Sequence, residues 1–238
     1  SDVYKRPARA NAAAPPGDLR ACASALGSRL TQAAIGKRSL FLLGAKGGNE
    51  KIWFLIGPWN DILKERMVGR GYVPMRYACV FGASCPNVAK AYLEAAFAVG
   101  ALLAEHGLGM VFGGGNTGLM GAAARGLKSK GGRLIGVIPE KLNQPGIAYP
   151  HCDQMIVTPD MHTRKAKMEA LSFGFLALPG GFGTLEELLE VITLNQLGYL
   201  QAPVVLLNTN GYYDQLLAQL DTCIAQDFTA PPCRGIYQ

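Results

Sequence analysis

The chain has 238 residues, of which 49% are hydrophobic, so it can bury one substantial core and we expect one catalytic domain with an appendage. Its formal net charge of +6 comes from the front, because residues 1–78 hold 13 Lys and Arg against 5 Asp and Glu, whereas residues 79–238 hold 10 against 12. The main body therefore carries no basic excess of the kind that polynucleotide binding requires.

Residues 1–76 are predicted to form a basic N-terminal extension. Within them, residues 1–38 are rich in Ala, Arg and Ser, a composition similar to a plastid or mitochondrial transit segment. A poorly ordered tail with one short helix fits the same residues equally well. Residues 39–75 alternate short apolar runs with Gly and Pro and suggest no function.

From Tyr77 onward, short apolar strands alternate with amphipathic helices. Strands are predicted at residues 77–81, 108–112, 133–138, 155–157, 173–178 and 204–207. Helices are predicted at residues 88–106, 119–130, 160–168, 184–196 and 212–225. Strands separated by helices need crossover connections, so the predicted fold is α/β, a Rossmann-like open parallel sheet with helices on both faces, in three layers. We place this domain at residues 77–228 and an irregular C-terminal tail at residues 229–238.

Three glycine-bearing turns each follow a predicted strand. They lie at Gly82, at residues 113–118 and at residues 180–183. Ligands of open parallel sheets bind beyond the carboxyl ends of the strands, so the three turns should meet at one edge. The third turn opens a helix, and its bare N–H groups at the positive end of the helix dipole favour an oxyanion. The sequence therefore predicts an anion site at this edge.

The turn at residues 113–118 also fits the dinucleotide fingerprint, with Gly113, Gly115 and Gly118 in register and Glu140 about 20 residues beyond. However, this turn follows the second regular strand, and Glu140 lies past Pro139 rather than at a strand tip. A single nicotinamide site would not need the second glycine loop. The pattern favours a mononucleotide or a sugar phosphate.

Two interpretations of Glu187 stay open on spacing alone. Thr184-Leu-Glu-Glu187 satisfies the capping box, in which Thr184 caps the helix and Glu187 reaches back to the N–H of the cap. Alternatively, Glu187 is a carboxylate at the rim of the anion site, facing sugar hydroxyls or a water. Arg164 and Lys165 are either surface charges or cations that share the site with an anion, because a cation in the first turn of a helix otherwise opposes the dipole.

The cysteine pattern and the hydropathy restrict the remaining classes. The six cysteines form no C-x-x-C pair, so neither a structural zinc nor a disulfide framework is expected, and a reducing compartment fits. No apolar run approaches the roughly 18 to 20 residues that span a bilayer. We expect a soluble protein without membrane or nucleic-acid partners, in the cytoplasm, or in the plastid if residues 1–38 are a transit remnant.

Residues from about Tyr77 to Asp227 resemble the Lonely Guy family of cytokinin riboside 5'-monophosphate phosphoribohydrolases, historically labelled lysine decarboxylase-like. The resemblance rests chiefly on three motifs: Phe-Gly-Gly-Gly-Asn-Thr-Gly-Leu-Met-Gly at 112–121, Met-His-Thr-Arg-Lys at 161–165 and Pro-Gly-Gly-Phe-Gly-Thr-Leu-Glu-Glu at 179–187. A pyridoxal-dependent decarboxylase would need a Schiff-base lysine in its own pocket, and no lysine has such a setting in the sequence.

The resemblance implies hydrolysis of the N-glycosidic bond of an N6-substituted adenosine 5'-monophosphate to the free base and ribose 5-phosphate, with no metal and no other cofactor. It implies that Arg164 and Glu187 are catalytic. The implied substrate- and phosphate-binding residues are Gly113, Gly114, Gly115, Thr117, Lys165, Gly180, Gly181, Gly183, Thr184, Glu186 and Thr193. Such a reaction needs a carboxylate and a positioned water at an oxocarbenium-like transition state. The resemblance also implies a homodimer with the site near the interface.

One position departs from the resemblance. Gly146 stands where plant members carry a glutamate, so recognition of the N6 substituent should differ, and a broader nucleotide 5'-monophosphate nucleosidase is an alternative. From a different class, a nucleotide or pterin-cofactor carrier on the same fold, similar to molybdenum cofactor carriers, would bind without turnover. The presence of both Arg164 and Glu187 favours the enzyme.

Overall fold

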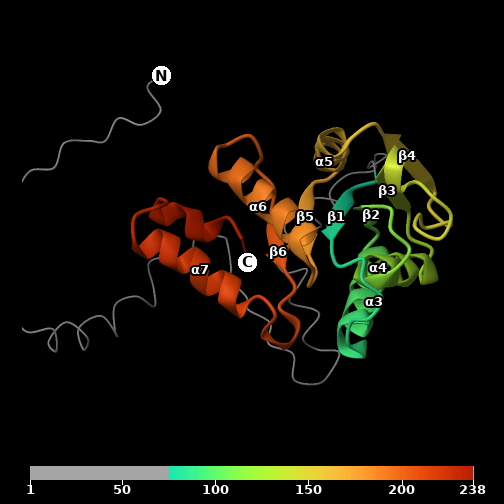
Figure 1. Ribbon diagram of the computed structural model, residues 1–238, viewed down its shortest axis with the longest axis horizontal. Coiled ribbons are helices and arrows are strands. Elements are labelled where there is room, and N and C mark those ends of the chain that lie inside the picture. The colour runs from blue at the N-terminus through green and yellow to red at the C-terminus, as the bar shows by residue number, and fades with distance from the viewer. Residues whose placement is uncertain (1–74, 238) are drawn as a thin grey trace, which may run out of the picture. The chain divides into compact units, whose positions relative to one another are not determined.

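The structure is a computed structural model that describes residues 75–237 (Figure 1). The predicted extension at residues 1–76 therefore lies outside the described residues, apart from Met75 and Arg76. No helix between residues 75 and 237 is long and apolar enough to cross a membrane.

The described residues form a six-stranded sheet, five α-helices and three short 3-10 helices. The strands are β1 (Tyr77–Phe81), β2 (Gly109–Phe112), β3 (Leu134–Pro139), β4 (Gln154–Thr158), β5 (Gly174–Ala177) and β6 (Val204–Leu206). The α-helices are α3 (Lys90–Glu105), α4 (Gly118–Ser129), α5 (Met161–Ala170), α6 (Phe182–Gln196) and α7 (Asp214–Ala225). The 3-10 helices are η3 (Glu140–Leu142), η4 (Thr209–Gly211) and η5 (Pro231–Gly235).

All strand pairs of the sheet are parallel, in the order β4-β3-β2-β1-β5-β6. The chain moves outward from β1 to β4 and then returns to place β5 on the other side of β1. The connections after β1 and β5 therefore diverge at the centre of the sheet, which is the switch point where ligands of such folds bind. The predicted parallel α/β sheet is confirmed, and each predicted strand is present within two residues.

Apolar side chains alternate along the strands and fill a core on each face of the sheet. Ala78 and Val80 of β1 point into the cluster beneath α3 and α4. Cys79 and Phe81 point to the opposite cluster, which also contains Met168 of α5 and side chains of α6. Figure 1 shows α3 and α4 on one side of the sheet and α5 and α6 on the other. This confirms the predicted three layers.

Glycines let α3 and α4 approach backbone to backbone. A Cβ at Gly100 of α3 would collide with the carbonyl of Ala123, and a Cβ at Gly126 of α4 would collide with the carbonyl of Phe97. Both helices also carry small alanines at their buried positions. The close pair covers one face of the sheet.

The C-terminal segment differs from the irregular tail that was predicted at residues 229–238. It contains η5, and Tyr237 forms a parallel bridge with Val204 at the exposed edge of β6. The ring of Tyr237 is buried in the same cluster as Phe175 and Val191. The sequence signal was weak because one buried aromatic residue and a single bridge leave no periodic pattern, yet an open sheet edge stabilises any strand that pairs with it.

Candidate active site

The three glycine turns meet at the carboxyl edge of the sheet and are joined by hydrogen bonds. The N–H of Ala83 donates to the carbonyl of Pro179 at 3.1 Å, which ties the turn after β1 to the turn after β5. The N–H of Leu119 donates to the carbonyl of Ala83 at 2.8 Å, and the Thr117 hydroxyl donates to the carbonyl of Ser84 at 2.6 Å. These bonds confirm the prediction that all three turns share one edge, and they place it at the switch point.

The third turn presents the free end of α6. Its N-cap is Gly181, which has no side chain to accept from the first amides, and the first N–H groups of a helix have no intrahelical carbonyl to bind. Gly181 and Gly183 are exposed, and added Cβ atoms there would meet nothing within 4 Å. Gly180 is different, because its own Cβ would collide with the side chain of Thr184. The geometry suits an anion at Gly181 and Gly183.

The capping-box interpretation of Glu187 is wrong. The helix begins at Phe182 rather than at Thr184, so Thr184 is a buried residue of the first turn and Glu187 lies in the second turn. From there its carboxylate cannot return to the N–H of the cap. The helix was predicted to begin at residue 184, and it begins two residues earlier, at Phe182.

Glu187 instead pairs with Arg164. The guanidinium Nη1 of Arg164 donates to Oε1 of Glu187 at 2.6 Å, and Nε donates to the carbonyl of Val137 at 3.1 Å. Arg164 is 7% exposed and Glu187 is 8% exposed. The pair joins α5, α6 and the end of β3, and a buried ion pair of this kind depends on both partners because either one alone would be an uncompensated charge.

Gly113 makes room for this arginine. A Cβ at Gly113 would collide with Nη2 of Arg164, so only glycine lets the guanidinium cross the end of β2. At the start of α5, the carboxylate of Asp160 accepts from the N–H of Thr163 at 2.7 Å and fixes the first turn that carries Arg164. Two separate motifs, Gly-Gly-Gly and Met-His-Thr-Arg-Lys, therefore build one side-chain position.

Electrostatics distinguish Glu187 from ordinary surface acids. Burial raises the pKa of Glu187 above its ordinary value, while the charge and hydrogen bond of Arg164 oppose that rise. A carboxylate with a raised pKa accepts a proton more readily near neutral pH than a free one does. Arg164 limits the shift and holds the carboxylate in one orientation, so the pair combines basicity with fixed geometry.

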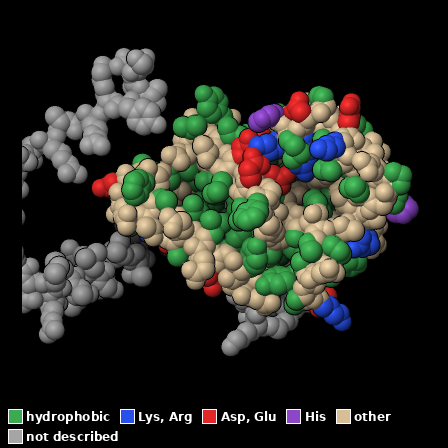
Figure 2. Space-filling view, viewed as in Figure 1, with side chains coloured by type: hydrophobic (Ala, Val, Ile, Leu, Met, Phe, Trp, Pro, Cys, Tyr) green, Lys and Arg blue, Asp and Glu red, His purple; other side chains and the backbone are tan. Residues whose placement is uncertain are grey.

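Lys165 and Glu186, both predicted to bind the substrate, form an ion pair with each other. The ammonium of Lys165 contacts Glu186 and also Glu190, at 2.9 Å from its Oε2. Burial lowers the pKa of Lys165, but its bonds to the two carboxylates outweigh this and leave the pKa raised. Figure 2 shows acidic and basic side chains gathered on the surface between α5 and α6. Such a lysine is held as a cation, which is the wrong state for a Schiff-base nucleophile.

The other predicted binding residues have structural contacts of their own. Gly114 has a φ of +77° and abuts Ile138, and Gly115 bridges to Ala148. The hydroxyl of Thr193 donates to the carbonyl of Leu189 at 2.7 Å, further along α6 and on an exposed face. Ligand contacts stay predictions for all the binding residues: Gly113, Gly114, Gly115, Thr117, Lys165, Gly180, Gly181, Gly183, Thr184, Glu186 and Thr193.

The loop at residues 139–150 lies against the second glycine turn. The N–H of Tyr149 donates to the carbonyl of Gly114 at 2.8 Å, and the N–H of Asn116 donates to the carbonyl of Ile147 at 2.8 Å. Gly146 has a φ of +83° and open space around its Cα. A glutamate there would have to adopt left-handed backbone, so glycine gives this loop a conformation that a glutamate would strain.

Two contacting residues were missed in the sequence. The hydroxyl of Tyr212 donates to the carbonyl of Gly180 at 2.5 Å, and that of Tyr213 donates to the carbonyl of Leu178 at 2.7 Å. Both follow β6, at the same sheet edge as the glycine turns. The rule that ligands bind beyond the carboxyl ends of strands applies equally to that turn and could have drawn attention to the tyrosine pair.

The fold and the site together define the class: a Rossmann-like α/β protein with an open helix N-terminus at the switch point and a buried Arg–Glu pair beside it. The profile of the family described as "Possible lysine decarboxylase" matches residues 120–238. Among the described residues, no group of three or more His, Cys, Asp or Glu side chains could hold a metal ion.

Similar proteins place the chain more narrowly. A probable cytokinin riboside 5'-monophosphate phosphoribohydrolase of Oryza sativa subsp. japonica is 44% identical over 161 residues, which are 68% of this chain and 65% of the relative. Another from the same organism is 44% identical over 66% of this chain and 75% of its own length. A cytokinin riboside 5'-monophosphate phosphoribohydrolase of Arabidopsis thaliana is 43% identical over 66% and 73%. The chain belongs to this family, although it spans less than two thirds of the first relative.

Solved structures agree with the fold. The molybdenum cofactor carrier protein of Chlamydomonas reinhardtii matches with a TM-score of 0.52 and 28% identity, over 63% of this chain and 86% of that one. A molybdenum cofactor binding protein of Rippkaea orientalis matches with a TM-score of 0.51 and 21% identity, over 70% and 90%. The second likeness is one of fold alone.

Proposed function

We propose that this protein hydrolyses the N-glycosidic bond of N6-substituted adenosine 5'-monophosphates, the cytokinin ribotides, and releases the free base and ribose 5-phosphate. The observation that carries the proposal is the position of Glu187. This buried acid is held by Arg164 of α5, and it lies on α6, the helix whose open amides suit a phosphate. The relatives that are 43% and 44% identical and are named for this activity support it.

The helix geometry matches the shape of such a substrate. Glu187 lies one turn beyond Gly183 on α6, which is roughly 6 Å along the helix axis. A 5'-phosphate on the amides of Gly181 and Gly183 would therefore direct the ribose along the helix toward Glu187. Phosphate and carboxylate would repel each other if they met, and this spacing keeps the ribose between them.

In the proposed reaction, water attacks the anomeric carbon of the ribose as the bond to the base nitrogen breaks. The electron pair of that bond leaves with the base, which is then protonated, and the attacking water loses a proton to Glu187. Arg164 keeps the carboxylate directed at the ribose. The transition state resembles an oxocarbenium ion, so the negative charge of Glu187 stabilises it as well.

A broader nucleotide 5'-monophosphate nucleosidase is the second candidate, and the conformation of Gly146 favours it. Its loop packs on the second glycine turn but contributes no side chain at that position. Isopentenyladenosine monophosphate and AMP should be compared as substrates, with free base and ribose 5-phosphate measured by chromatography. Release from the N6-substituted substrate alone supports the narrow activity, and release from both supports the broad one. Tight binding of both without any base would refute hydrolysis in favour of the carrier.

We also propose that the chain acts as a homodimer, as the resemblance implies. In support, α6 and its end expose large apolar side chains, among them Phe182 at 93%, Leu197 at 58% and Tyr199 at 78%. Light scattering of the purified chain should give twice the monomer mass, and a monomer would contradict the proposal.

We further propose a cytoplasmic location, or a plastid one if residues 1–38 are a transit remnant. Fluorescent fusions with and without those residues distinguish the two.

A further inference from the structure

The carbonyls of three consecutive residues before α6 are each bound by a donor from elsewhere in the fold. Leu178 accepts from the hydroxyl of Tyr213, Pro179 accepts from the N–H of Ala83, and Gly180 accepts from the hydroxyl of Tyr212. The donors come from the turns after β6 and β1, which flank β5 in the sheet. The glycine turn is therefore fixed by its carbonyls, on the side opposite to its amides.

Two of these three bonds also set the direction of an amide N–H. A peptide unit is planar and trans, so its carbonyl and the N–H of the following residue point in opposite directions. The bond from Tyr212 to Gly180 therefore fixes the N–H of Gly181, and the bond from Ala83 to Pro179 fixes the N–H of Gly180. The bond from Tyr213 to Leu178 fixes no amide, because the next residue, Pro179, has no N–H.

The turn that carries the tyrosines is itself strongly constrained. The side chain of Asn208 accepts from the N–H of Tyr213 at 2.7 Å and donates to Asp214 at 2.7 Å. Asn210 has a φ of 54°, and the ring of Tyr212 packs edge-on against Tyr213, with ring centroids 5.0 Å apart. Tyr212 also packs edge-on against Tyr92 of α3, with centroids 6.1 Å apart. The hydroxyl of Tyr212 is thus delivered to Gly180 by fixed neighbours.

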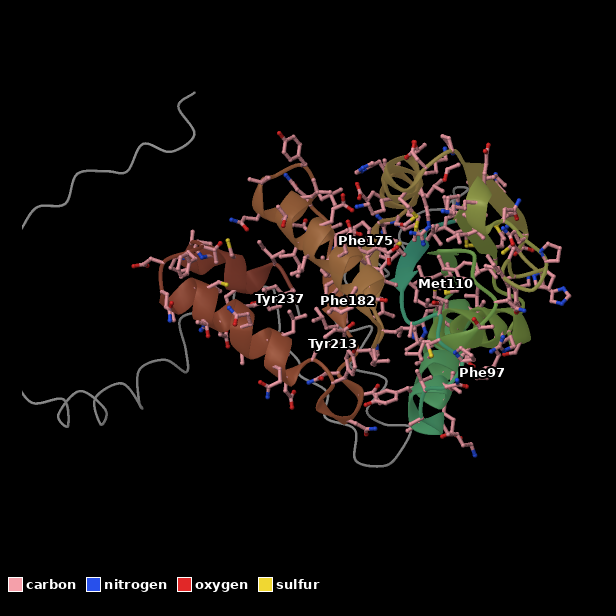
Figure 3. All side chains as sticks on the ribbon, viewed as in Figure 1. Phe97, Met110, Phe175, Phe182, Tyr213 and Tyr237 are labelled. Atoms are coloured by element: carbon pink, nitrogen blue, oxygen red, sulfur yellow. The ribbon has the colours of Figure 1, made fainter. Side chains whose placement is uncertain are left out.

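We propose that Tyr212 is a positioning residue for substrate phosphate, which aims the amide of Gly181 by holding the carbonyl of Gly180. The inference rests on the proposed phosphate site at the start of α6. Tyr212 itself does not touch the substrate. Tyr213, one residue along and bound to the same segment, only supports the fold. Figure 3 shows Tyr213 where the chain enters α7.

The pair provides a matched test in which one hydroxyl is removed at a time. Tyr212→Phe should weaken binding of ribose 5-phosphate about tenfold, since one hydrogen bond that orients a charge-binding amide is lost. Its affinity for adenosine, which has no phosphate, should stay within twofold. Tyr213→Phe should lower the melting temperature while its affinity for ribose 5-phosphate stays within twofold of the unaltered chain. Titration calorimetry measures the affinities, and circular dichroism confirms folding at the assay temperature.

Two results would overturn the inference: Tyr212→Phe binding ribose 5-phosphate as well as the unaltered chain, or Tyr213→Phe weakening it as much as Tyr212→Phe does. An unaltered chain that does not bind ribose 5-phosphate at all would overturn it too. If the affinities follow the expected pattern and no variant releases base from any nucleotide, the proposed hydrolysis fails while the role of Tyr212 stands.

Discussion

At the scale of single residues, the Arg164–Glu187 pair stands out as a buried ion pair beside the open start of α6. Both side chains are charged and almost fully buried, a state that is costly unless each neutralises the other. Surface acids of the same helix, such as Glu186, have solvent and Lys165 to satisfy them. The burial and fixed partner of Glu187 are properties that a reacting carboxylate needs and that a helix cap does not.

Replacing the carboxylate of Glu187 tests its role directly. Glu187→Gln keeps the size and an acceptor for Arg164 but removes the base, so base release should fall by about a hundredfold or more while nucleotide affinity changes little. Steady-state kinetics and titration calorimetry measure the two quantities. Glu94→Gln, in an exposed ion pair on α3, is the matched control and should stay within twofold. A Glu187→Gln variant with most of its activity would refute the assigned role.

The pH profile should carry the signature of the same carboxyl. Because burial raises the pKa of Glu187 above its ordinary value of 4.5, with Arg164 opposing, the ionised base is lost at a higher pH than for a free glutamate. The value of kcat/KM should therefore fall as pH decreases, with a midpoint above 4.5. Circular dichroism across the same range controls for unfolding. An activity that stays constant down to pH 4.5 would contradict a catalytic base at this position.

Gly113 should be required by the arginine rather than by the backbone. A methyl group there would displace the guanidinium, which is held on its other sides by Glu187 and the carbonyl of Val137. Gly113→Ala should lower kcat at least tenfold with little change in overall fold. Gly235→Ala, where an added Cβ meets nothing, is the control and should keep full activity. Unchanged kinetics for Gly113→Ala would show that the pair tolerates displacement.

At the scale of secondary structure, the ends of elements determine what the site can do. The start of α6 is open because Gly181 caps it without a side chain, whereas the start of α5 is closed by Asp160. One helix end is thus available to a ligand and the other serves only to hold Arg164. Lys165 then ties the two helices together through Glu186 and Glu190.

Asp153, just before β4, contacts β3 and α4, and we expect its contribution to stability to depend on pH. Burial pushes the pKa of Asp153 up, but the N–H of Leu134 and the ammonium of Lys128 outweigh this and hold the pKa below its ordinary value. Its folded pKa is depressed, so its contribution to stability is present above the ordinary value and is lost as pH falls through the folded one. Asp153→Asn should lower the free energy of unfolding at pH 7 by about 1 kcal/mol and reduce its dependence on acid.

Chemical denaturation of both proteins between pH 2 and pH 7 measures this effect. Lys90→Gln removes an exposed ion pair with Glu94 and should leave the profile unchanged. If the free energies of unfolding of the unaltered chain and of Asp153→Asn differ by the same amount at every pH, the linkage between α4, β3 and β4 is not ionic.

At the scale of the whole molecule, the order of strands brings distant motifs together. Because β5 and β1 are neighbours, the turns at Gly82 and Pro179 lie side by side although they are almost a hundred residues apart in sequence. The outer position of β6 adds the tyrosine pair to the same edge. Because β6 lies beside β5 in this order, the turn after β6 brings Tyr212 to Gly180.

A chain that starts at Met75 should fold and act by itself. The described residues contain a core on both faces of the sheet and all the residues assigned to the site. The truncated chain should unfold in one cooperative transition and keep its rate of base release within about threefold. Calorimetry and the chromatographic assay test this, with the full chain as reference. A truncated chain that is folded but inactive would assign a catalytic contribution to residues 1–74.

The sequence by itself determined the elements and the shared edge, because strand and helix periodicity are local and parallel strands must place their following turns together. It could not decide whether Glu187 caps α6, since a capping box and a catalytic carboxylate can share the same spacing; the start of α6 at Phe182 excludes the cap. Tertiary structure alone revealed the fit of Arg164 across Gly113, the pairing of Tyr237 with β6 and the hold of Tyr212 on Gly180. Each of these is a contact between residues far apart in the chain, where a single side chain leaves no repeating pattern to read.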